Sequence, residues 1–213
     1  MAAEGSDSFD TLLSILNFLI SKSPELKESL SRIIENLIAG KRYLKGEYKA
    51  NCASATGSEV ADHCRFFALS DPKMEEYRHD CDHTHEKRCT DCESLKTALS
   101  EALEIVNAAA NLNKKEKDNF VYDLNEAIII INTWKAHILT VIHQETQKTD
   151  ILENLNSNTA FIIVDFAMKF LSRRYRESMA KWFGKAGHGM HVLHAVYLED
   201  TMVILSKEHI FYS

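Results

Sequence analysis

The chain has 213 residues, of which 45% are hydrophobic, and a net charge of −6. These values fit a globular protein of one or two domains and give no reason to expect nucleic-acid binding by the chain as a whole. Its five cysteines are odd in number and cluster at metal-ligand spacing, which argues against a secreted disulfide framework and favours a reducing, intracellular compartment. The first ten residues lack the basic segment of a signal peptide, and the apolar run 12–20 is too short to cross a bilayer.

Two amphipathic helices are predicted at the N-terminus. Apolar residues recur at helical spacing over 8–20 and again over 26–38. Ser23 is placed to cap the second helix, Pro24 suits its first position, and Gly40 is the predicted end. We expect a helical hairpin within residues 1–50, whose apolar faces pack in a core or against a second copy.

The next two segments differ in their apolar content. Residues 51–95 contain too few large apolar side chains to fold around a core of their own, so we expect a bound metal to stabilise them. Residues 96–156 form a predicted helical pair, with one helix over about 93–110 and a longer one over about 116–147. The β-branched run 128–131 is assigned to the long helix because its flanks are strongly helical.

Strands are predicted after residue 157. The run 160–168 is a buried strand, 190–198 a second, and 203–205 with 209–212 form one or two more. The later strands are expected to form an antiparallel meander, and a sheet of so few strands is expected to be incomplete. The predicted fold class is therefore α+β and mostly α.

Six candidate metal ligands lie within 29 residues: Cys64, Cys81, His83, His85, Cys89 and Cys92. Thiolates and imidazoles at this spacing are typical of tetrahedral zinc. The first-choice set is Cys81, His85, Cys89 and Cys92, and Cys64 is an alternative to one of them. A second ion held by Cys64, His63 and His83 is a further alternative. The surplus of ligands favours a closed structural site over a catalytic one.

Two further features concern chemistry near the C-terminus. Asp165 interrupts an apolar strand, where a carboxylate is costly unless it is paired or binds a metal. Basic residues then alternate with aromatic ones, which predicts either phosphate contacts or a solvated loop whose rings pack on the sheet. The candidate nucleic-acid ligands are Lys169, Arg173, Arg174, Arg176, Lys181 and Lys185.

The order of these motifs resembles a group of uncharacterised, transposon-derived proteins of cnidarians, sponges and fishes. The resemblance covers about residues 41–198 and rests on His63-Cys64, 68–72 (Ala-Leu-Ser-Asp-Pro), the Cys/His motifs, 134–137 (Trp-Lys-Ala-His), 165–170 (Asp-Phe-Ala-Met-Lys-Phe), 175–178 (Tyr-Arg-Glu-Ser) and 182–185 (Trp-Phe-Gly-Lys). It implies that 157–213 is the start of an RNase H-like integrase core and that Asp165 is its first metal-binding carboxylate.

The chain departs from that family because it contains no second acidic motif with Asp-Asn-Ala-Gly. One carboxylate cannot hold two divalent ions, so we expect only the N-terminal part of such a protein, without a complete catalytic site, and magnesium only if other sequence completes it. The predicted function is a zinc-stabilised, transposase-derived fragment, located in the nucleus, that retains nucleic-acid binding. The alternatives are a zinc-dependent adaptor that binds proteins or itself through the N-terminal helices, and a metal-dependent nuclease or integrase completed by missing or partner sequence.

Overall fold

The structure is a computed structural model, and it describes residues 2–53, 58–71, 73–78, 80–170, 188–199 and 203–212. The chain forms two compact units, Met1–Glu145 and Thr146–Ser213. The first unit contains the expected hairpin, the Cys/His segment and most of the expected helical pair. The chain is mostly helical with a small antiparallel sheet, which confirms the α+β, mostly α class.

Four long helices build the first unit. They are α1 (Ala2–Lys22), α2 (Lys27–Lys45), α5 (Thr90–Ala108) and α6 (Lys114–Glu153). The shorter elements are α3 (Glu47–Ala53), α4 (Arg65–Ala68) and the 3-10 turns η1 (Pro24–Leu26), η2 (Ala61–His63) and η3 (Glu75–Tyr77). The predicted helices are confirmed, including the β-branched run 128–131, which lies inside α6.

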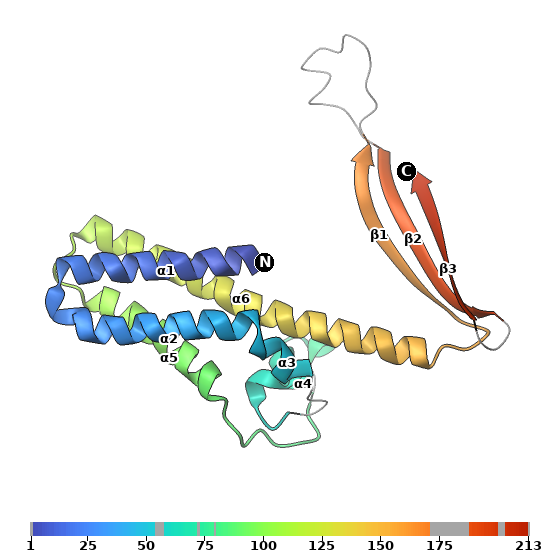
Figure 1. Cartoon of the computed structure of the whole chain (residues 1–213), viewed down its shortest axis with the longest axis horizontal. Helices are drawn as coiled ribbons and strands as arrows, with labels where there is room; N and C mark the ends of the chain where they lie inside the picture. Colours follow the sequence, from blue (N-terminus) through green and yellow to red (C-terminus); the bar gives the residue numbers. More distant parts are fainter. Residues whose placement is uncertain are drawn as a thin grey trace, which may run out of the picture. The chain divides into compact units, whose positions relative to one another are not determined.

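One hydrophobic core joins the four long helices, which lie alongside one another in Figure 1. Phe9 of α1 is fully buried and meets Trp134 of α6 edge to face, with ring centroids 6.4 Å apart. Phe18 and Phe120 form a second such pair at 5.4 Å. Of the two expected roles for the apolar faces of the hairpin, the structure therefore shows packing in a core.

Gly40 does not end the second helix, as the sequence had indicated, because α2 continues to Lys45. A Cβ at Gly40 would lie 2.7 Å from Leu95 Cδ1, so the missing side chain lets α5 approach α2 closely. Ser23 occupies the predicted cap position but makes no capping hydrogen bond. Its hydroxyl instead accepts a hydrogen bond from Asn111 Nδ2 at 2.8 Å.

The second unit contains the strands β1 (Ala160–Phe170), β2 (His188–Glu199) and β3 (Val203–Tyr212). They pair antiparallel in the order β1-β2-β3, which confirms the meander, and the two short strands considered after 203 are one. Three consecutive β1 residues are exposed, Ile162 by 53%, Ile163 by 37% and Val164 by 61%. Because neighbours in a strand face opposite sides, solvent reaches β1 from both faces of the sheet. The strand is therefore confirmed, but the prediction that it is buried is wrong for these residues. Within the described residues, no helix has the length and hydropathy needed to cross a membrane.

Candidate metal centre

The loop segment, residues 58–89, connects α3 to α5 and has almost no apolar interior. Its described part contains only α4, η2 and η3 as helical turns, and only His63, Cys64 and Arg65 are buried. Its two ends are held together by a parallel bridge between Val60 and Lys87, in which Lys87 N–H donates to Glu59 O at 3.1 Å. A segment with so little buried apolar surface needs another source of order.

The Cys64 cluster consists of Cys64, Cys81, His83 and His85, whose potential ligand atoms all lie within 4.8 Å of one another. Cys64 Sγ lies 3.6 Å from Cys81 Sγ and 3.5 Å from His83 Nε2. Two thiols and two imidazoles therefore converge on one point and could hold a metal ion.

The two histidines of the Cys64 cluster are arranged as metal ligands require. His83 Nδ1 donates a hydrogen bond to the Asp82 carboxylate at 2.9 Å, so Nε2 is the nitrogen that faces the cysteines. A carboxylate on the outer nitrogen is the usual way to orient a ligating histidine. His85 Nε2 is buried and has no hydrogen-bond partner among the described residues. A buried nitrogen without a partner is unfavourable unless a cation takes that place.

The cysteines of the Cys64 cluster differ in acidity. Burial alone would raise the pKa of Cys64, but the backbone N–H of Phe67 and the neighbouring His85, Cys81 and His83 stabilise the thiolate and bring the pKa to about 6. Burial and the adjacent Cys64 raise the pKa of Cys81 to about 11. The metal-free pair is thus one thiolate and one thiol at neutral pH, and a divalent ion would displace the remaining proton.

The Cys92 cluster consists of His63, Cys89 and Cys92, whose potential ligand atoms also lie within 4.8 Å of one another. His63 Nε2 lies 3.6 Å from Cys92 Sγ. Tyr43 of α2 reaches the same place, with Oη 2.9 Å from His63 Nε2 and 3.3 Å from Cys89 Sγ. Burial, and after it Lys135, lowers the pKa of His63, which favours the neutral ring that a metal ligand requires.

The structure distributes the predicted ligands over two groups instead of one. The first-choice set is corrected: Cys81 and His85 lie in the Cys64 cluster, whereas Cys89 and Cys92 lie in the Cys92 cluster. The alternative second set is corrected as well, since His63 is grouped with the two later cysteines and not with Cys64. His63 and Cys64, which are adjacent along the chain, therefore belong to different groups.

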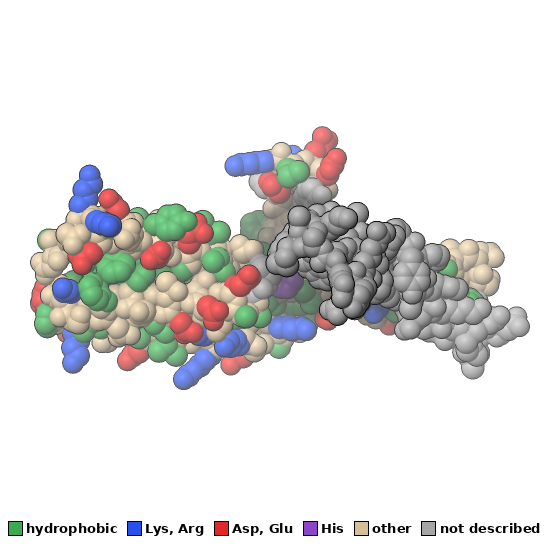
Figure 2. Space-filling view, turned by 90° about the horizontal axis from the view of Figure 1, so that it is seen from above, with side chains coloured by type: hydrophobic (Ala, Val, Ile, Leu, Met, Phe, Trp, Pro, Cys, Tyr) green, Lys and Arg blue, Asp and Glu red, His purple; other side chains and the backbone are tan. Residues whose placement is uncertain are grey.

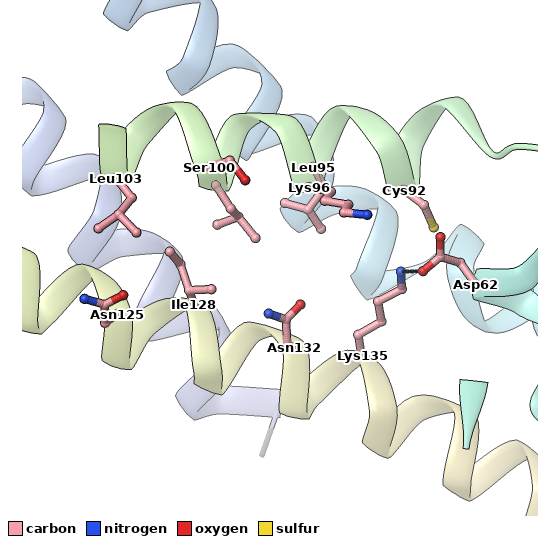
Figure 3. Close-up of a pocket in the computed structure, with 11 residues that line it drawn as sticks. Asp62, Cys92, Leu95, Lys96, Ser100, Leu103, Asn125, Ile128, Asn132 and Lys135 are labelled. Atoms are coloured by element: carbon pink, nitrogen blue, oxygen red, sulfur yellow. Dashed lines mark hydrogen bonds and ion pairs between the residues drawn. The ribbon is translucent and has the colours of Figure 1, made fainter. Parts of the chain in front are cut away.

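Lys135 of α6 fixes the segment that carries His63. Its ammonium forms an ion pair with Asp62, the residue before His63, and Tyr48 Oη donates to Asp62 O at 2.8 Å. Figure 3 shows this pair, with Cys92, at one end of a cavity of about 420 Å³ between α5 and α6. The cavity is lined by apolar side chains of both helices, such as Leu95 and Ile128, together with amides and Lys96. The helical core thus holds the backbone next to His63 through Lys135 and Tyr48, and Cys92 is itself a core residue.

The predicted acidic and basic sites lie in the second unit. Asp165 is a residue of β1 whose backbone is paired with Val192, and Lys169 is paired with Gly189. Their side chains are outside the described part of the structure, as are Arg173, Arg174, Arg176, Lys181 and Lys185. The predictions for these residues stay predictions.

Sequence reasoning missed two side chains that support the clusters. Asp82 stands next to a predicted ligand, and this proximity could have indicated its hydrogen bond to His83. Tyr43 lies 20 residues before His63 and beyond the predicted end of the second helix at Gly40, where nothing in the sequence indicates that it reaches the cluster. No known protein family, curated protein or solved structure matches the chain, so the chemistry of these clusters is the basis for assigning a function.

Proposed function

We propose that the protein is a zinc-binding protein in which the Cys64 cluster holds one structural zinc ion, and that it acts by binding a partner and not by catalysis. The observation that carries the proposal is the convergence of Cys64, Cys81, His83 and His85 to within 4.8 Å. Two cysteines with two histidines form one of the usual ligand sets of structural zinc.

The distances within the Cys64 cluster support a tetrahedral ion. With Zn–S near 2.3 Å and Zn–N near 2.1 Å, a regular tetrahedron separates two sulfurs by about 3.8 Å and sulfur from nitrogen by about 3.6 Å. The corresponding separations are 3.6 Å between Cys64 and Cys81 and 3.5 Å between Cys64 and His83. Four protein ligands leave no coordination position for a substrate, which favours a structural role.

The loop segment needs the free energy that zinc supplies. Structural zinc contributes about 10–16 kcal/mol of apparent binding free energy in small finger peptides. Because only His63, Cys64 and Arg65 are buried in the described part of this segment, the ion would replace a hydrophobic core as the reason for its order.

Zinc analysis of the purified protein tests this proposal. Protein prepared under reducing conditions should contain bound zinc, and Cys64→Ser should lower the content by one ion per chain. Cys52→Ser is the matched control, because Cys52 is a buried cysteine outside both clusters. Protein without zinc, or a Cys64→Ser variant with as much zinc as the unaltered chain, would refute the proposal.

Nucleic acid is the partner that the sequence favours. Residues 169–185 contain six basic residues and one acidic residue in a chain whose net charge is −6. By contrast, Figure 2 shows basic and acidic side chains interspersed over the described part of the helical unit on the face in view. The proposal of nucleic-acid binding therefore rests on the basic stretch and not on the helices.

The salt dependence of duplex DNA binding tests this partner. Replacing Arg173, Arg174 and Arg176 with glutamine should weaken binding and reduce the slope of log affinity against log salt by about 2.7, since each phosphate contact contributes about 0.9. A matched control replaces three exposed lysines of the helical unit, Lys45, Lys114 and Lys115. Equal effects of the two triple variants, or none, would favour the alternative of a zinc-dependent protein adaptor.

A transposase origin is a further part of the proposal. The antiparallel order β1-β2-β3, with Asp165 on the first strand, supports the proposed resemblance to the start of an RNase H-like core. Magnesium-dependent DNA cleavage that is lost in Asp165→Asn would favour the nuclease alternative over binding alone.

A further inference from the structure

We infer that the Cys92 cluster is a second metal site, which binds a thiophilic divalent ion such as Zn²⁺ through His63, Cys89 and Cys92. The inference goes beyond the proposed zinc ion and stands on separate ligands, because the two clusters share no residue. The protein would therefore bind two ions per chain.

The beginning of α5 places the two sulfurs together. Cys89 is the N-cap of this helix and Cys92 lies in its first turn. Although the backbone of Cys89 is extended, its sulfur lies within 4.8 Å of the Cys92 sulfur. Burial raises the pKa of the Cys92 thiol, so an ion that binds here would displace its proton. Cys92 is only 4% exposed and belongs to the helical core, which makes its position rigid.

The core also fixes the imidazole that faces these sulfurs. His63 is 7% exposed, and its ring packs edge to face on Tyr48 with centroids 5.7 Å apart. Its Nε2 lies 3.6 Å from Cys92 Sγ, which equals the sulfur–nitrogen edge of about 3.6 Å expected for tetrahedral zinc. The neighbouring Asp62 is tied to Lys135 and to Tyr48, so the backbone on this side is held as well.

Tyr43 occupies the remaining side of the Cys92 cluster. Its hydroxyl accepts a hydrogen bond from Asn51 Nδ2 at 3.2 Å and lies 3.3 Å from Cys89 Sγ. With a metal present, the Tyr43 hydroxyl proton would be donated to the Cys89 thiolate, an outer contact that stabilises a ligand. Three protein ligands leave one coordination position for water. The competing explanation is a metal-free buried histidine whose Nε2 is satisfied by Tyr43 at 2.9 Å, and the number of bound ions separates the two.

The position of the Cys92 cluster gives the second ion a distinct role. His63 lies near the beginning of the loop segment, and Cys89 and Cys92 lie at and just beyond its end. The Cys64 cluster lies within the loop. An ion between His63 and the two cysteines would close the loop at its base and fasten it to α5. Its binding free energy would offset the entropy lost when the ends of the loop are brought together. The ion in the Cys64 cluster would order the interior of the loop, and the ion in the Cys92 cluster would hold its two ends together.

Counting ions in matched variants tests the inference. The unaltered chain and the Cys52→Ser control should each bind two zinc ions, and the double variants Cys89→Ser/Cys92→Ser and Cys64→Ser/Cys81→Ser should each bind one. If the unaltered chain binds only one ion, and Cys89→Ser/Cys92→Ser still binds it, the second site is overturned and the proposed function stays intact. If the unaltered chain binds only one ion, and that ion is lost in Cys89→Ser/Cys92→Ser but kept in Cys64→Ser/Cys81→Ser, the proposed function is overturned instead. Loss of an ion in Cys52→Ser would overturn the assigned ligand set.

A measurement on the unaltered protein avoids variants that fail to fold. Exchange of the bound metal for cadmium-113 should give two NMR resonances of equal intensity, both in the range of thiolate-ligated cadmium. One resonance at saturating cadmium would overturn the second site. Two resonances, of which one disappears in Cys89→Ser/Cys92→Ser while the other keeps its position, would support it.

Discussion

Removal of the metal is expected to release the loop segment while the helical core stays folded. The core includes buried residues of all four long helices, and none of its fully buried, described members lies in residues 58–88, from which the partly buried Leu69 packs against it. The loop segment has only three buried residues of its own in the described part. Local unfolding follows such differences in buried contacts, so the two regions should respond differently to a chelator.

The size of the effect can be worked out from amides that are hydrogen-bonded inside the segment. Cys64 N–H donates to Val60 O at 3.0 Å, and Ala68 N–H donates to Cys64 O at 2.8 Å. If only about 4 of the 10–16 kcal/mol attributed to structural zinc opposes local opening, exchange of these amides should be about 10³-fold faster without metal. In the described part of the segment the only α-helix has 4 residues, against 19 or more in each core helix. Helical circular dichroism should therefore fall by only about 5%.

Hydrogen exchange with mass spectrometry, before and after chelation, measures both regions in one experiment. Peptides of α5 that contain Leu99 and Val106, which are buried in the core, serve as the internal control. The reasoning is refuted if amides of the loop segment keep their protection in metal-free protein. It is also refuted if protection is lost equally in α5, because the ion would then hold the whole unit together.

Three further predictions concern packing and pH. Gly40→Val should lower the free energy of unfolding by about 1–3 kcal/mol, because a Cβ at this position would lie 2.7 Å from Leu95 Cδ1 of α5. Gly46→Val is the control, since the nearest atom to its Cβ would lie at 3.8 Å. Equal urea midpoints for the two variants would contradict the steric argument. Trp134→Ala removes a core side chain that is 4% exposed and should cost about 3–5 kcal/mol, whereas Tyr122→Ala, at 65% exposure, should change urea unfolding little. The zinc affinity of the Cys64 cluster should rise about tenfold per pH unit near pH 8, because the Cys81 thiol, with a pKa of about 11, must lose its proton to bind. Competition with a chelator measures this affinity, and an affinity independent of pH would contradict the prediction.

Local pattern was sufficient to predict most of the secondary structure. The helical stripes of α1, α2, α5 and α6 and the apolar runs of the three strands are visible in the sequence, because periodicity depends only on residues close together in the chain. Gly40 shows the limit of such reasoning. Glycine is typical of a helix end, but in α2 it is an interior residue required by the approach of Leu95, which is distant in sequence.

The residue types of the candidate metal centre could be predicted from the sequence, because cysteines and histidines at short spacing indicate metal binding whatever the fold. Their division into two groups depends on the tertiary structure. The parallel bridge between Val60 and Lys87 brings both ends of the loop together. His63 then meets Cys89 and Cys92, while Cys64 meets Cys81, His83 and His85. Spacing along the chain limits which ligands can meet, but the closure of the loop against the helical core selects which of them do.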